Sequence, residues 1–147
     1  MKISKQVEPL VRSALDAAVK RDFDRLDAAL KAFPNDQAVA EAVALALSVI
    51  LYVLRDLHHG KPSKPETEAI AAEIARGEAW AQPTEGEVKT FLVKLVNGEP
   101  LAEDLPSESV IVLAFVSAAS LLASCHREDE QWWDYLDRAE TALEAGA

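Results

Sequence analysis

Two segments of this chain have apolar side chains around most of the helical circumference, whereas the other predicted helices are apolar on one face only. Residues 38–57 carry no charge between Glu41 and Arg55, and residues 109–125 carry none at all. A helix that is apolar all round must be surrounded either by other helices or by lipid. These two segments are therefore predicted to lie at the centre of the structure.

Length separates a membrane span from a buried helix. The charge-free run from 42 to 54 has 13 residues, or about 20 Å of helix, against a hydrocarbon layer of about 30 Å. The run from 109 to 125 has 17 residues and reaches the lower limit, but it contains four serines and has no basic flank. We therefore expect buried helices of a soluble bundle, with no membrane as partner.

Amphipathic segments surround the two apolar helices. Residues 3–20 repeat apolar side chains at intervals of three and four, which predicts a helix that starts near Glu8 or is kinked at Pro9. Asp22 is placed to cap a short helix over residues 23–33.

Capping residues predict the remaining boundaries. Ser63 and Thr84 are each followed three residues later by glutamate, which predicts two capping boxes. Gly60 predicts a left-handed end for the first apolar helix. Ser107 is expected to cap the second apolar helix, and residues 128–130 are expected to open the last helix with negative charge at its positive end.

The chain is therefore predicted to be all-α, with residues 1–147 forming a single-domain helical bundle of about seven helices. The order short amphipathic, long apolar, loop, amphipathic occurs twice, in residues 23–80 and in residues 88–143. One interpretation is a pseudo-repeat of three plus three helices around two buried apolar helices, preceded by an extra N-terminal helix.

A stretch of about 25 residues resembles a known repeat unit. Lys20-Arg21-Asp22-Phe23-Asp24 resembles the turn between the two helices of a tetratricopeptide unit, and Pro34-Asn35-Asp36 resembles its closing Pro-Asn step. The resemblance implies a helical hairpin. The glycine usual in that turn is Arg21 here, and no second copy follows, so a generic hairpin is predicted.

Negative charge is concentrated in the C-terminal half. The net charge is −10, with 10 basic and 11 acidic residues up to Glu73, and 5 basic and 14 acidic residues from Ile74 onward. Such a field attracts basic partners and repels phosphate backbones and anionic membranes. We expect a basic protein partner and no direct binding of nucleic acid.

Two acidic clusters are candidate partner-binding surfaces. Trp132 and Trp133 are adjacent on the last helix and cannot both face the core, so one is expected at the rim, where tryptophan often anchors an interface. If both clusters lie on one side, they form a broad negative surface. The candidates are Glu128, Asp129, Glu130, Trp132, Trp133, Asp134 and Asp137 near the last helix, with Glu103 and Asp104 in the connector before the second apolar helix. The alternative interpretation is that both clusters are ordinary runs of solvent-exposed charge, which require no function.

Histidines and the single cysteine stand at the ends of the two apolar helices. His58, His59, Cys125 and His126 could meet if the pseudo-repeat brings those ends together, and imidazole and thiolate groups suit zinc. The ordinary explanation is that histidine is favourable at a helix C-terminus without any metal. Metal binding is therefore an alternative, and no cofactor is expected.

The sequence contains no string typical of a phosphate-binding loop, a nucleophile elbow or a metalloprotease helix. Enzyme status stays open and leans towards a non-enzymatic protein. One cysteine allows no internal disulfide, and no secretory signal is visible, which suits a cytoplasmic setting.

The leading hypothesis is a non-enzymatic protein-interaction module, for example an acidic inhibitor, immunity or antitoxin-type protein that engages a basic partner. The first alternative is a homo-oligomeric structural domain, such as a homodimer. The second is a small-molecule or metal-binding helical protein, with a pocket between the apolar helices marked by Ser117, Ser120, Tyr52 and the histidines.

Overall fold

The computed structural model describes residues 1–146, and its regular structure is entirely helical. The elements are α1 (Glu8–Val19), α2 (Phe23–Lys31), α3 (Asp36–His58), α4 (Lys64–Gly77), the short 3-10 helix η1 (Ala79–Ala81), α5 (Glu85–Asn97), α6 (Ser107–Cys125) and α7 (Trp132–Glu144). The described residues contain no strand. The predicted all-α, single-domain bundle of seven helices is confirmed.

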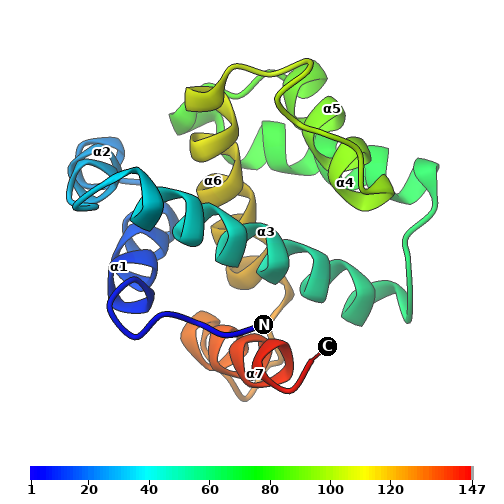
Figure 1. Cartoon of the computed structure of the whole chain (residues 1–147). Coiled ribbons are helices and arrows are strands. Elements are labelled where there is room, and N and C mark those ends of the chain that lie inside the picture. Colours follow the sequence, from blue (N-terminus) through cyan, green and yellow to red (C-terminus); the bar gives the residue numbers. More distant parts are fainter. Residues whose placement is uncertain (147) are drawn as a thin grey trace.

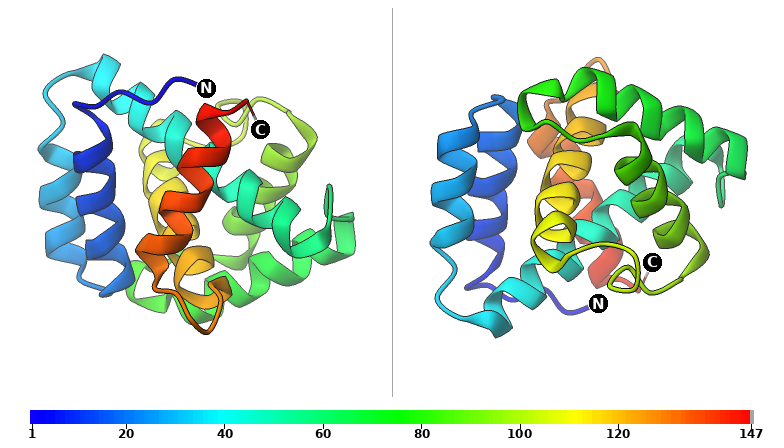
Figure 2. Two further views of the ribbon diagram at one scale, coloured as in Figure 1. Left: turned by 90° about the horizontal axis from the view of Figure 1, so that it is seen from below. Right: turned by 90° about the horizontal axis from the view of Figure 1, so that it is seen from above.

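The two apolar helices, α3 and α6, cross at the centre of the molecule (Figure 1). Helix α1 packs on α6 and pairs with α2 at one edge, α4 pairs with α5, and α7 lies against α3 and α6 (Figure 2). The α4–α5 pair joins elements from the two halves of the expected pseudo-repeat. The bundle is therefore organised around the α3–α6 crossing rather than as two separate groups of three helices.

Burial follows from the apolar character of these helices. By length and composition alone, α3 and α6 could each cross a membrane, and about half of the most apolar stretch of each is buried within the protein. The largest fully buried side chains are aromatic. Phe91 on α5 and Tyr135 on α7 belong to the helices that surround α3 and α6, and Phe115 belongs to α6 itself. The amphipathic helices thus cover the apolar pair with their own apolar faces.

Side-chain caps fix several helix starts where the sequence predicts them. The carboxylate of Asp22 accepts a hydrogen bond from the backbone N–H of Arg25 at 3.1 Å. Ser63 and Glu66 form the expected reciprocal capping box. Helix α1 begins at Glu8, one of the two predicted outcomes for Pro9.

Four other boundary predictions are wrong in detail. Glu87 accepts a hydrogen bond from the Thr84 hydroxyl instead of the backbone N–H, so that capping box is incomplete. Ser107 is the first residue of α6, and its side chain makes no cap. Residues 128–130 form the turn before α7, and Gln131 occupies the N-cap position of that helix. Helix α3 ends in a left-handed residue at His59 (φ 54°), one position before Gly60.

The turn between α1 and α2 has a left-handed residue at the position where the tetratricopeptide unit has glycine. Arg21 adopts φ 55° there, which is strained for a residue with a β-carbon. Its guanidinium reaches the Glu78 carboxylate after α4, at 3.3 Å. The side chain therefore contributes a long-range contact that glycine could not supply.

Candidate functional site

The loop between α6 and α7 is held in place by Glu130. Its Oε1 accepts hydrogen bonds from Nη2 of Arg138 at 2.7 Å and from the backbone N–H of Arg127 at 2.9 Å. These bonds lower the pKa of Glu130 to about 2. Glu130 was expected to face a partner, but the structure uses its charge inside the protein.

Three further carboxylates of the expected surface also make hydrogen bonds or ion pairs within the protein. Asp134 accepts a hydrogen bond from the backbone N–H of Gln131 at 2.8 Å and so caps its own helix. Asp137 pairs with Arg12 on α1 at 2.8 Å. Asp104 pairs with Lys94 at 2.6 Å. Ion pairing reduces the free negative charge that Asp137 and Asp104 offer to a partner, whereas Asp134 keeps its full charge and remains exposed.

The two adjacent tryptophans differ sharply in exposure. Trp132 is 8% exposed and belongs to the core, whereas Trp133 is 46% exposed. Their rings meet edge to face, with centroids 5.9 Å apart. Glu128 and Asp129, in the turn just before α7, are exposed and make no hydrogen bond or ion pair with any other described residue. The structure thus places an exposed aromatic ring in the first turn of α7, directly after a turn that carries two unpaired carboxylates.

The two acidic clusters lie at opposite ends of α6. The connector with Glu103 and Asp104 precedes Ser107, and the turn with Glu128 and Asp129 follows Cys125 (Figure 1). The 19 residues of α6 span about 28 Å at 1.5 Å per residue. The clusters therefore do not form the single broad negative surface that was considered from sequence.

Helix α7 is attached to α3 through Tyr135. Its hydroxyl donates a hydrogen bond to Oδ2 of Asp56 at 2.6 Å. Burial and this bond raise the pKa of Tyr135 well above its ordinary value. The Arg138 guanidinium lies 4.2 Å from the centre of the Tyr135 ring, and the Tyr52 ring meets that ring edge-on. This cluster fixes the end of α7 that carries Trp133.

Helix α7 is attached to α1 through Arg12. The guanidinium contacts Glu8 at 2.7 Å and Glu140 at 3.0 Å, in addition to Asp137. Burial and the neighbouring Glu8 carboxylate raise the pKa of Glu140 to about 7, against the attraction of Arg12. The charge of the Glu140 carboxylate in its contact with Arg12 therefore changes near neutral pH.

The metal candidates do not converge on one point. Nδ1 of His58 donates to the Leu54 carbonyl at 2.8 Å, and Nδ1 of His126 lies 2.7 Å from the Arg127 carbonyl. His59 is exposed. Burial raises the pKa of the Cys125 thiol, which disfavours the thiolate that zinc requires. Within residues 1–146, no three His, Cys, Asp or Glu side chains are arranged to hold a metal ion.

The residues expected to mark a pocket are only partly brought together. Ser120, His58 and Cys125 line one cavity of about 500 Å³. Ser117 is fully buried elsewhere, and its hydroxyl has no hydrogen-bond partner among the described residues.

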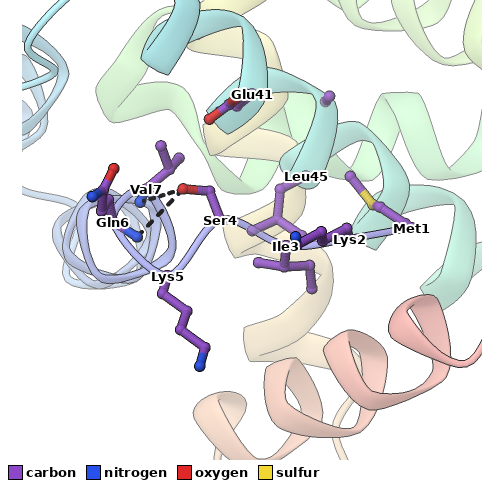
Figure 3. A pocket seen from close by; sticks show the side chains of 10 residues that line it. Met1, Lys2, Ile3, Ser4, Lys5, Gln6, Val7, Glu41 and Leu45 are labelled. Atoms are coloured by element: carbon purple, nitrogen blue, oxygen red, sulfur yellow. Dashed lines mark hydrogen bonds between the residues drawn. The ribbon is translucent and has the colours of Figure 1, made fainter.

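A second cavity, of about 640 Å³, lies beneath the N-terminal segment, where residues 1–7 cross α3 beside Glu41 and Leu45 (Figure 3). The Ser4 hydroxyl accepts hydrogen bonds from the backbone N–H groups of Gln6 and Val7, both at 3.3 Å. These bonds close a turn at the start of α1, and the Ser4 side chain is used in that turn.

No protein-family model, curated protein or solved structure matches the chain.

Proposed function

We propose that the chain is a non-enzymatic protein-interaction module that binds a basic protein partner. The binding surface consists of Trp133, Glu128, Asp129 and Asp134, and we call it the Trp133 surface. The observation that carries the proposal is the exposure of Trp133, 46% against 8% for its neighbour Trp132. Burial of the exposed part of such a ring in a partner would contribute about 2–3 kcal/mol.

Charge favours a basic protein over a second copy of this chain. In a two-fold dimer formed through this surface, Glu128, Asp129 and Asp134 would face the same carboxylates of the partner copy. Like charges brought together in an interface cost several kcal/mol. A basic partner would instead pair with these groups. Arg127 lies in the same turn and reduces the local negative charge, so shape as well as charge must select the partner.

The surface is organised before any partner arrives. The Glu130 carboxylate bonds both Arg138 and the backbone of Arg127, and the Tyr135 hydroxyl holds α7 on α3. A surface that is already ordered loses less conformational entropy on binding. The acids that were expected to contact a partner but pair internally, such as Glu130, would therefore act by positioning Trp133.

The test compares two exposed aromatic residues. Phe23 on α2 is 51% exposed and lies outside the Trp133 surface, so Phe23→Ala is the matched control for Trp133→Ala. Each protein is used for affinity capture from an extract of the native cell, and the affinity of the captured protein is then measured. The proposal requires at least a tenfold loss for Trp133→Ala and no loss for Phe23→Ala. Equal affinity of both variants would contradict it.

Salt dependence tests the charged part of the surface. The double variant Glu128→Gln, Asp129→Asn should weaken binding and flatten its dependence on salt, because fewer counterions are exchanged. The control removes two charges at the other end of α6, with Glu99→Gln and Glu103→Gln. If the control changes the salt dependence as much as the test variant, the partner does not recognise the Trp133 surface specifically.

A further inference from the structure

Four helices end around the cavity of about 500 Å³. Val19 at the end of α1, His58 at the end of α3, Gly77 at the end of α4 and Cys125 at the end of α6 all line it. The carbonyl end of a helix carries a partial negative charge. The volume is also in the range of about 300–1,000 Å³ that is usual for small-molecule sites. The cavity therefore combines space for a ligand with a negative electrostatic environment.

One of the two carboxylates in the lining keeps its charge unpaired. Glu78 is 4% exposed and is satisfied, since it accepts hydrogen bonds from Arg21 at 3.3 Å and from the Trp80 indole at 3.2 Å. Arg21 is the one lysine or arginine in the lining. Glu73 is exposed, and its side chain makes no hydrogen bond or ion pair in the described part of the chain. A negative charge thus remains at the cavity.

The polar groups at the end of α6 offer acceptors, whereas His58 is already in contact at both ring nitrogens. Nδ1 of His58 donates to the Leu54 carbonyl, and Nε2 lies 3.7 Å from Oε2 of Glu66, which is outside the lining. The Ser124 hydroxyl donates to the Ser120 carbonyl, and its oxygen, which also lies 3.8 Å from Sγ of Cys125, keeps a lone pair. No backbone N–H among the described residues caps the last carbonyls of α6.

The remaining walls are hydrocarbon. Leu57 from α3, Ile70 and Ile74 from α4, and Leu121 from α6 supply them. Such walls favour burial of an aliphatic body at about 0.8 kcal/mol for each methylene group.

We propose that this cavity binds a small organic cation, with a primary ammonium group beside Glu73 and an aliphatic body against the apolar walls. The Arg21–Glu78 pair closes one side of the site and cancels its own charge, which leaves Glu73 to select the head group. The proposal is independent of the Trp133 surface, because it uses the C-terminal ends of helices and none of the residues of that surface.

Three probes of equal chain length test the choice of head group. Hexylammonium, hexanol and hexanoate are titrated into the full chain, and binding is followed by NMR shifts of assigned amides. We expect hexylammonium to bind at least tenfold more tightly than hexanol, with shifts at Glu73 and Ser124, and hexanoate not to bind. Binding of hexanoate as tight as that of hexylammonium would overturn the proposal. The proposal would also be overturned if no probe binds at a 10-fold molar excess over millimolar protein.

Two variants separate recognition of charge from recognition of shape. Glu73→Gln should bring hexylammonium to the affinity of hexanol, whereas Glu144→Gln, which removes one exposed charge on α7, should leave both unchanged. Ala123→Phe, at an exposed position of the lining, should abolish binding of both hexylammonium and hexanol. Equal effects of Glu73→Gln and Glu144→Gln would show a response to net charge alone and would contradict the site.

Discussion

The hydroxyl of Tyr135 on α7 donates a 2.6 Å hydrogen bond to the carboxylate of Asp56 on α3, across 79 positions of sequence. The bond attaches the helix that carries Trp133 to one of the two central helices. The same tyrosine ring lies under the guanidinium of Arg138, which in turn binds Glu130 in the preceding loop. The position of the Trp133 surface therefore depends on this bond.

Tyr135→Phe should lower the free energy of unfolding by about 1 kcal/mol, because one hydrogen bond is lost and Asp56, which is partly exposed, can bind water instead. The control is Tyr52→Phe, since the Tyr52 hydroxyl has no hydrogen-bond partner among the described residues. Urea denaturation of both variants measures the difference. An equal loss of unfolding free energy in both variants would mean that the Tyr135–Asp56 hydrogen bond does not stabilise the fold.

Glu140 should make stability depend on pH. Its pKa is raised from 4.5 to about 7 in the folded protein, so the folded state favours the protonated carboxyl. The stabilisation is complete below about pH 4.5 and is lost as pH rises through about 7. Glu140→Gln, which stays neutral, should lack this fall, whereas Glu144→Gln should retain it. Denaturation at pH 5, 6, 7 and 8 tests this, and an unchanged pH profile in Glu140→Gln would contradict it.

The buried hydroxyls of Ser117 and Thr67 should behave differently. The Ser117 hydroxyl has no partner in the described structure, whereas that of Thr67 donates to the Ser63 carbonyl at 2.8 Å. Ser117→Ala should be neutral or stabilising by up to about 1 kcal/mol, since it removes an unsatisfied polar group. Thr67→Val should destabilise by about 1 kcal/mol through the lost bond. A loss above 1 kcal/mol in Ser117→Ala would reveal a partner for that hydroxyl.

Arg21 and His59 occupy the same left-handed conformation, with φ near 55°, but only Arg21 pairs with a buried carboxylate. His59→Gly should stabilise by about 0.5–1 kcal/mol through relief of strain. Arg21→Gly should instead destabilise by about 1–2 kcal/mol, because Glu78 loses its partner while only 4% exposed. Thermal denaturation compares the two, and stabilisation by both variants would show that the Arg21–Glu78 pair is dispensable.

Local patterns in the sequence predict the helices well. The charge-free runs identify α3 and α6, and the side chains of Asp22 and Ser63 cap the helices that they were expected to cap. These features depend on residues only a few positions apart, so periodicity and spacing contain the information. The last helix starts later than expected because Glu130 binds Arg138 instead of entering the helix.

Contacts between distant elements could not be predicted in the same way. Arg12 with Glu140 and Tyr135 with Asp56 depend on which helices become neighbours, and nothing in the local pattern specifies that. The exposed charge at the candidate surface was overestimated for the same reason.

Hydrogen–deuterium exchange of the complex with the captured basic partner locates the bound surface. Binding should slow exchange in residues 126–134, which contain the Trp133 surface, and leave the acidic connector at residues 99–106 unchanged. Slower exchange in the connector, with residues 126–134 unaffected, would contradict the proposed surface.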